Sequence, residues 1–245
     1  MPWQTLSLHF KQTYEGGYRY FDNCGEFMIE AVEKLNVISS EIKPTGAKME
    51  IPERGVNATC DANSLVVVQE LPPAGDESYF VNLCKEFADL ANFHFEPTKI
   101  VRNGFLWKSY APFAQVPDML AASLKFGGDF QAELAKIVGM VPEHKRLDYF
   151  LTSGSKDLQV ILHPVTFERV NLSKRNPGFR ASGSEKSRID RFNQFANRIG
   201  DALSNALVLD VDLMENDPPQ AVSLDEHFGE LKKKSDSLRT LFSIG

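Results

Sequence analysis

The sequence predicts an α+β fold of two ferredoxin-like (split β-α-β) units in tandem, the second degenerate, with a C-terminal amphipathic helix. Between about residues 5 and 112, strand and helix patterns follow the order strand, helix, strand, strand, helix, strand. A second run of strand, strand, helix and strand then leads to about residue 213. The linker Asp217-Pro218-Pro219 precedes the last helical segment. The predicted division is 1–113 for the first unit, 114–216 for the second and 217–245 for the C-terminal helix.

The first strand and helix follow from periodicity and a capping signal. Apolar and polar residues alternate over 6–11, which is the two-residue period of a half-buried strand. Asn23 with Glu26 three residues later matches the start of a helix, and apolar residues then recur at helical spacing. We therefore expect a helix over about 23–36.

The rest of the first unit is expected to hold two strands, a helix and a closing strand. Residues 47–51 alternate until Pro52, and the unbroken apolar run 65–68 is typical of a central strand covered on both faces. Asp76 is placed to cap a helix that Pro97 ends. The stretch 98–113, TKIVRNGFLWKSYAPF, supplies the closing strand.

The second unit shows two helices, a hairpin, a further helix and a last strand. Ser153-Gly154-Ser155 is the hairpin turn signal. The expected elements begin at residue 116 and continue at 129–138, 147–152, 158–165, 189–203 and 207–213.

The C-terminal segment has apolar residues spaced by three and four, as in an amphipathic helix. These residues are Leu224, Phe228, Leu231, Leu238 and Phe242. Such a stripe needs a partner surface, either within the chain or on another protein.

Composition excludes some classes of protein. The formal net charge of −6 argues against a chain that coats nucleic acid or a polybasic membrane protein. Three cysteines without a CxxC pair indicate free thiols, and no apolar run reaches the length of a membrane span. We expect a cytoplasmic protein that does not bind membranes.

Two patterns are compatible with nucleic-acid binding. Phe105 and Trp107 share one face of their strand, as base-stacking aromatics do, although core aromatics show the same spacing. A basic loop and helix follow further along, and they fit either phosphate binding or a solvated surface. The basic residues are Lys174, Arg175, Arg180, Lys186, Arg188, Arg191 and Arg198.

Asp210 and Asp212 point to the same side of a strand, so two carboxylates there could share Mg²⁺ as in nucleases. Alternating acids on an exposed strand face show the same pattern, and spacing fixes no third ligand. The histidines form no HxxxH or HExxH motif, and GxSxG, GxGxxG and GxxxxGK[ST] do not occur. We expect no cofactor and assign no catalytic residue.

Three stretches resemble a sporadically distributed bacterial family of uncharacterised two-part α+β proteins. They are SLVVVQELPPAGDESYFVNLCKEFADLANFHF, TKIVRNGFLWKSYAPF, and NALVLDVDLMEND followed by SLDEHFGELKKKSDSLRTLF. The second departs from the family, which carries a Gly-Leu-Arg-Tyr type core where this chain has Gly104-Phe105-Leu106-Trp107. The resemblance implies no catalytic residues, and it implies an association with mobile or defence-related genes.

These observations favour a non-enzymatic binding or accessory protein, part of a bacterial defence or toxin-related complex, that acts through contact with a protein partner or with itself. The alternative is a module that binds RNA or single-stranded DNA through the basic loop and helix. A third hypothesis is a Mg²⁺-dependent nuclease at Asp210 and Asp212.

Overall fold

The computed structural model describes residues 3–43, 46–113, 116–124, 137, 146–166, 205–218 and 223–242. Its strands are β1 (Gln4–Glu15), β2 (Ile38–Lys43), β3 (Gly46–Ile51), β4 (Val56–Cys60), β5 (Ser64–Glu70), β6 (Lys99–Phe113), β7 (Leu147–Ser153), β8 (Lys156–Thr166) and β9 (Asn205–Asn216). Its helices are α1 (Tyr20–Leu35), α2 (Glu77–Phe95), α3 (Val116–Leu124) and α7 (Leu224–Leu241), with a 3-10 turn at Pro52–Arg54.

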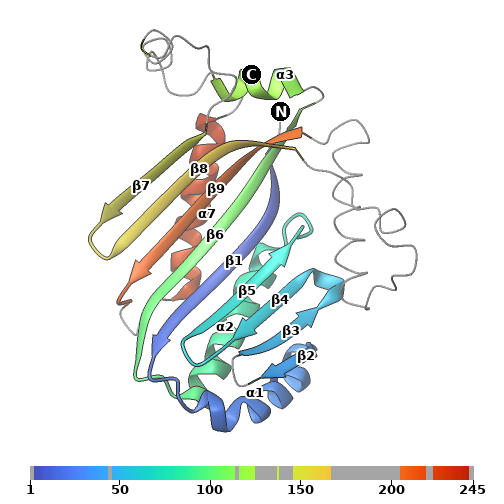
Figure 1. The fold of residues 1–245 in the computed structure, drawn as a ribbon, viewed down its shortest axis with the longest axis vertical. Helices are drawn as coiled ribbons and strands as arrows, with labels where there is room; N and C mark the ends of the chain where they lie inside the picture. Colours follow the sequence, from blue (N-terminus) through green and yellow to red (C-terminus); the bar gives the residue numbers. More distant parts are fainter. Residues whose placement is uncertain are drawn as a thin grey trace.

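The described strands form a nine-stranded sheet in the order β2-β3-β4-β5-β1-β6-β9-β8-β7 (Figure 1). Every neighbouring pair is antiparallel. The prediction of two ferredoxin-like units in tandem is therefore wrong, because one large sheet takes the place of two small ones.

The central strand β6 explains the difference. One edge of β6 pairs with β1 and the other pairs with β9, from Arg102↔Asn216 to Phe113↔Asn205. The strands of the second half therefore extend the first sheet instead of building their own. Residue 113, where the first unit was expected to end, is the last residue of β6 and lies inside this continuous sheet.

Two strands that the sequence did not reveal also enlarge the sheet. In β4 the buried residues are Val56, Ala58 and Cys60, an alternating set that is easily missed because two of its members are small. In β2 the side chains of Ile38 and Ile42 are more than half exposed, so these two apolar residues do not mark a buried face.

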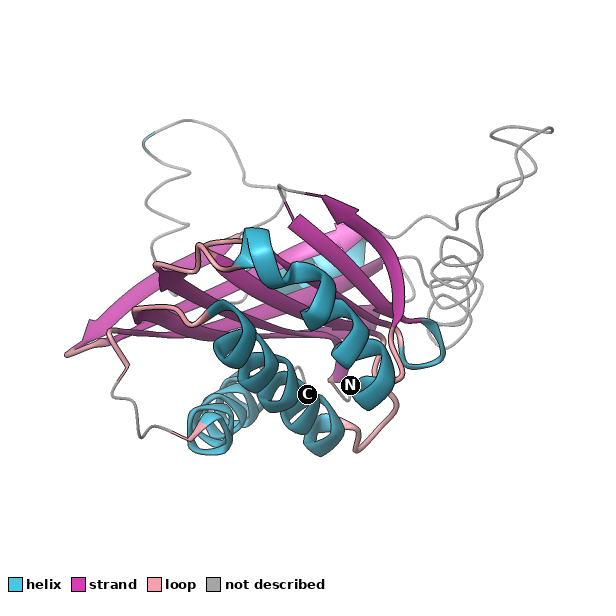
Figure 2. Cartoon of the chain, turned by 90° about the horizontal axis from the view of Figure 1, so that it is seen from below, coloured by secondary structure: helices cyan, strands magenta, loops and turns pink. Residues whose placement is uncertain are grey.

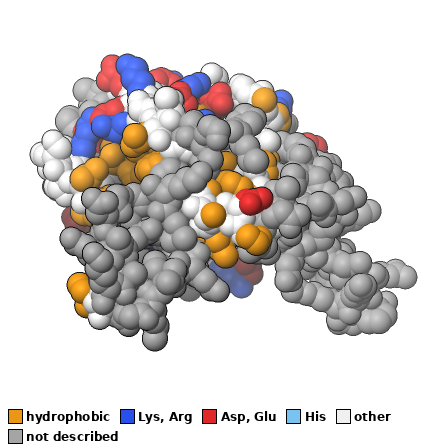
Figure 3. Space-filling view, turned by 90° about the horizontal axis from the view of Figure 1, so that it is seen from above, with side chains coloured by type: hydrophobic (Ala, Val, Ile, Leu, Met, Phe, Trp, Pro, Cys, Tyr) orange, Lys and Arg blue, Asp and Glu red, His pale blue; other side chains and the backbone are white. Residues whose placement is uncertain are grey.

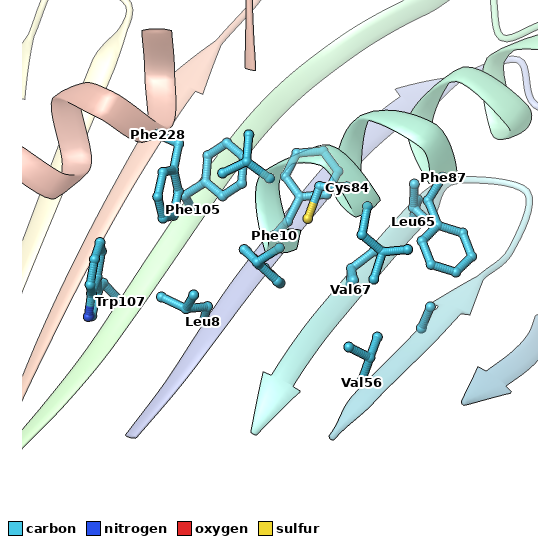
Figure 4. Close-up of a cluster of buried hydrophobic side chains, with 14 of the residues drawn as sticks. Leu8, Phe10, Val56, Leu65, Val67, Cys84, Phe87, Phe105, Trp107 and Phe228 are labelled. Atoms are coloured by element: carbon cyan, nitrogen blue, oxygen red, sulfur yellow. The ribbon is translucent and has the colours of Figure 1, made fainter. Parts of the chain in front are cut away.

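The long helices α1, α2 and α7 lie on one side of the sheet (Figure 2). α1 and α2 pack on each other, with the rings of Phe27 and Phe95 centred 4.9 Å apart. Inward-facing side chains from the strands meet these helices in a continuous core (Figure 4). Its fully buried members include Leu8, Phe10, Leu65, Val67, Phe87 and Phe105.

α3 lies at one end of the sheet, where it contacts β6, β8 and β9 (Figure 1). Met119 and Ala122 of this helix are buried in the core. Figure 3 looks onto this end of the molecule, where hydrophobic and charged side chains of the described residues are both visible.

α7 docks within the chain, on β6 and β9. The ring of Phe228 stacks on Trp107 at 5.5 Å and 18°, and the Arg239 guanidinium lies 4.8 Å from the Trp107 ring. Arg239 also donates hydrogen bonds to Ser109 Oγ, at 2.9 Å and 2.6 Å. Stacked rings and a cation over an aromatic face each add to the gain from apolar burial.

Replacing Phe228 by alanine is expected to lower the free energy of unfolding by about 3–5 kcal/mol, because a buried ring is lost from the contact between α7 and β6. Leu241→Ala on the same helix is the control, since Leu241 is 71% exposed and its loss should cost about 0.5 kcal/mol or less. Urea unfolding followed by circular dichroism measures both. Equal effects of the two changes would contradict this account of α7 docking.

Candidate interaction site at the β7 edge

The outer edge of β7 carries three consecutive exposed apolar residues. Tyr149, Phe150 and Leu151 are 49%, 60% and 53% exposed. β7 ends the sheet, and its outer edge has no hydrogen-bonded neighbour among the described strands (Figure 1). A regular edge strand with apolar side chains can bind another strand, because it offers unpaired backbone N–H and C=O groups together with apolar surface that is buried on contact.

The opposite edge of the sheet, β2, is protected against the addition of another strand. Its pairing with β3 shifts register between Ser39 and Glu41, and it carries the charged side chains of Glu41 and Lys43. A register irregularity and charges are the usual means by which proteins prevent strand addition. β7 pairs with β8 without a shift, so the two edges differ in kind.

The β7–β8 turn sets which backbone groups of β7 point outward. A two-residue loop, Gly154-Ser155, joins the pair Ser153↔Lys156, and Gly154 has φ 61° as a primed hairpin turn requires. The pair that flanks such a loop exchanges both backbone hydrogen bonds, and pairs then alternate. It follows that Asp148, Phe150 and Thr152 direct their N–H and C=O groups to the free edge.

Polar contacts hold the start of β7 in place. Gln159 Nε2 of β8 donates a hydrogen bond to Asp148 Oδ1 at 3.1 Å, and Arg146 lies 3.6 Å from the other oxygen of this carboxylate. Asp148 and Phe150 share one face, since they pair with Ile161 and Gln159. The edge strand thus has three apolar residues at its centre, 149–151, with the polar residues Asp148 before them and Thr152 after them.

The sequence predicted a strand at 147–152 but did not single out Tyr149, Phe150 and Leu151 as a site. Three adjacent apolar residues predict burial on both faces, as in a central strand. Only the position of β7 at the end of the sheet exposes them. The signal was present in the sequence, but its meaning depends on strand order.

Asp210 and Asp212 of β9 do lie on one face, opposite the long helices, as the spacing predicted. Asp210 Oδ2 accepts a hydrogen bond from Lys108 Nζ at 2.9 Å, so an ammonium group already sits at this carboxylate. Burial raises the pKa of Asp212, and Arg102 opposes this effect. Among the described residues, no group of three His, Cys, Asp or Glu side chains is arranged to hold a metal ion.

Ser7 and His9 of β1 lie on the same face of the sheet as Asp210 and Asp212, on the other side of β6. The register places Ser7 opposite Lys108 of β6, and Lys108 opposite Asp210 of β9. Ser7 Oγ and His9 Nε2 are 2.8 Å apart. Burial, and to a lesser extent the positive charge of Lys108, lower the pKa of His9 to about 4, and the negative charge of Asp210 partly opposes them. The imidazole is therefore neutral at pH 7.

The aromatic pair of the predicted stacking surface lies inside the protein. Phe105 and Trp107 are 0% and 1% exposed and face α7. Of the apolar stripe of α7, Phe228, Leu231 and Phe242 are buried and Leu224 and Leu238 pack partly buried against the core. The stripe of this helix therefore contacts the chain's own sheet.

The predicted basic surface lies outside the described residues. This applies to Lys174, Arg175, Arg180, Lys186, Arg188, Arg191 and Arg198.

No protein-family model matches the chain, and no curated protein matches it. Within the described part of the chain, none of the helices has both the length and the apolar character that crossing a bilayer requires. All three cysteines, Cys24, Cys60 and Cys84, are free thiols, which confirms that expectation.

His9 is expected to make folding stability depend on pH. Its folded pKa of about 4 lies below the ordinary value of 6.5, so the unfolded chain binds the proton more readily. The stabilisation is complete above pH 6.5 and is lost as the pH falls to about 4, a change of about 1–3 kcal/mol. Unfolding of wild type and His9→Gln at pH 7 and pH 4.5 measures it, since the variant lacks this contribution. An identical pH dependence in both proteins would show that His9 does not contribute.

Proposed function

We propose a non-enzymatic binding protein that acts through protein–protein contact, made by strand addition at β7. One observation carries the proposal: Tyr149, Phe150 and Leu151 stay exposed on a strand whose outer edge pairs with no other described strand, while the β2 edge carries a register shift and charges. Strand addition uses main-chain hydrogen bonds for affinity and alternating side chains for selectivity.

The strand that fits this edge is β7 of a second copy. With a two-fold axis at Phe150, this residue lies opposite its own copy, and its outward N–H and C=O groups pair with the same groups of the partner. Tyr149 then lies beside Leu151 of the copy, and Asp148 beside Thr152. Apolar residues meet apolar ones and polar meet polar, without a charge opposite its own kind.

Other registers are less favourable. An axis at Tyr149 places the carboxylate of Asp148 beside Phe150, and an axis at Asp148 brings two carboxylates together. Of these three registers, the axis at Phe150 is the one that pairs apolar residues with apolar residues and keeps the two carboxylates apart.

Cross-strand pairs contribute about 0.2–1 kcal/mol each, so a contact made of five residue pairs is weak and depends on concentration. Weak self-association suits an accessory protein whose edge is exchanged for another strand. The family resemblance, the bacterial defence or toxin-related complex that it implies and the cytoplasmic location stay predictions. The nucleic-acid-binding and Mg²⁺-nuclease alternatives also stay predictions.

Phe150→Lys is expected to abolish dimerisation, because the two-fold axis places two lysines opposite each other and removes the central apolar pair. Sedimentation equilibrium from about 5 to about 500 µM protein should show a monomer–dimer equilibrium for wild type and only monomer for the variant. The fold should be unaffected, since Phe150 is 60% exposed.

Ile42→Lys is the matched control, because Ile42 is 51% exposed on the opposite edge strand. This variant should dimerise like wild type. A wild-type chain that stays monomeric throughout, or a Phe150→Lys variant that still dimerises, would refute the proposed contact. Loss of the dimer in Ile42→Lys alone would place the contact at β2 and also refute it.

A further inference from the structure

A second exposed apolar surface lies on α1, which packs on α2 and β2 at the far end of the sheet from β7 (Figure 1). One side of α1 is buried in the core, but its outward side carries Phe21, Ile29 and Val32, which are 57%, 62% and 42% exposed. Tyr18, in the turn before the helix, is 74% exposed. Residues 21, 25, 29 and 32 follow one another along this side of the helix, so the apolar surface is a continuous stripe.

Gly25 lies in the middle of the stripe, four residues after Phe21 and four before Ile29. Glycine inside a helix is less stable than alanine. Within the part of the chain that the structure describes, a β-carbon at residue 25 would meet no atom within 4 Å, so the chain's own packing does not require a glycine there. The missing side chain does let another helix approach α1 closely.

Gly229 of α7 shows that an open helical glycine is not enough by itself. It too has no neighbouring atom that a β-carbon would meet. Its neighbours four residues away are Asp225 and Lys233, which are charged and exposed, so its surroundings are polar. Of these two helical glycines, Gly25 is the one that lies between exposed apolar side chains.

A row of exposed acids runs along one flank of the stripe. The row consists of Asp22, Glu26 and Glu33. None of these acids forms an ion pair with a described residue, and the basic residues Arg19 and Lys34 are already paired with Glu96 and Glu30. The surface of α1 is therefore apolar along its centre and negative along one side.

The geometry points to α1 as the docking surface for an amphipathic helix of a partner protein. Apolar residues of that helix pack on Phe21, Ile29 and Val32, its closest approach is at Gly25, and its lysines or arginines lie beside the acidic row. The backbone groups of α1 are hydrogen-bonded within the helix, so α1 offers side chains and cannot take up a strand. The surface is separate from the strand contact at β7.

A second copy of α1 fits this surface less well than a basic helix. A two-fold axis at Gly25 would place the acidic rows of the two helices side by side, and like charges at that distance repel each other. The charge on the flank thus favours a partner of the opposite sign.

NMR titration of the ¹⁵N-labelled full chain tests the surface with a synthetic peptide of about 18 residues, which is long enough to form a helix. The peptide contains Leu, Ala and Lys, with leucines at three- and four-residue spacing and lysines along one side. It should shift the backbone signals of residues 18–33 with a Kd of about 0.1–1 mM. A peptide with Glu in place of Lys, and one with the same composition in scrambled order, should each bind at least about tenfold more weakly.

Gly25→Gln should weaken binding of the lysine peptide about tenfold, because the new side chain keeps a second helix away from α1. The same change should raise the urea concentration of half-unfolding, because glutamine is a better helix former than glycine. Gly229→Gln is the matched control, since this glycine is also open and also lies inside a helix. It should stabilise the chain likewise and bind the peptide like wild type.

Several results would overturn the assignment. They are equal affinity for the lysine and glutamate peptides, shifts confined to residues outside α1, and unchanged binding by Gly25→Gln. Co-sedimentation with phosphatidylglycerol vesicles that Gly25→Gln abolishes would identify a lipid surface as the occupant instead. Loss of the wild-type dimer in Gly25→Gln, measured by sedimentation equilibrium, would identify a second copy.

Discussion

The structure depends on β6 being paired along both of its edges. Its pairing with β1 connects it to the strands of the first half of the chain, and its pairing with β9 connects it to β8 and β7. Because hydrogen bonds in an antiparallel sheet are satisfied only in a matching register, this strand fixes the positions of both halves at once. The helices then cover the face that β6 and its neighbours make apolar.

Trp107 of β6 makes several of the contacts that hold the C-terminal helix α7 on the sheet. Trp107 of β6 stacks on Phe228, lies under the Arg239 guanidinium, and its indole N–H donates to Thr5 Oγ1 at 3.2 Å. Burial lowers the pKa of Arg239, while Asp236 and Glu77 oppose that effect. The arginine stays charged and covers an aromatic face that would otherwise meet water.

Sequence patterns located most of the elements but not their assembly. The period of Leu6, Leu8 and Phe10 and the helical spacing around Phe80 and Phe87 identify β1 and α2, since local periodicity reflects burial on one face. Strand order is set by long-range pairing, so nothing near 113 in the sequence revealed that β9 would join β6.

The candidate site at β7 and the burial of single polar residues were harder still to predict. Three neighbouring apolar residues at 149–151 predict a buried strand. Their exposure follows only from the position of β7 at the end of the sheet. Gln12 has the same parity in β1 as the apolar residues Leu8 and Phe10, and the structure shows that it is buried and hydrogen-bonded to Asn103. In both cases the chemistry is local, but the environment comes from segments far apart in the chain.

The unequal edges of the sheet bear on how far an assembly can grow. Joining β7 to β7 places both β2 edges on the outside, where the irregular register at Ser39 and the charges of Glu41 and Lys43 stop further addition. Joining β7 to β2 would instead repeat head to tail and give an open fibre. A sheet protected at one end only can therefore close as a pair but cannot polymerise.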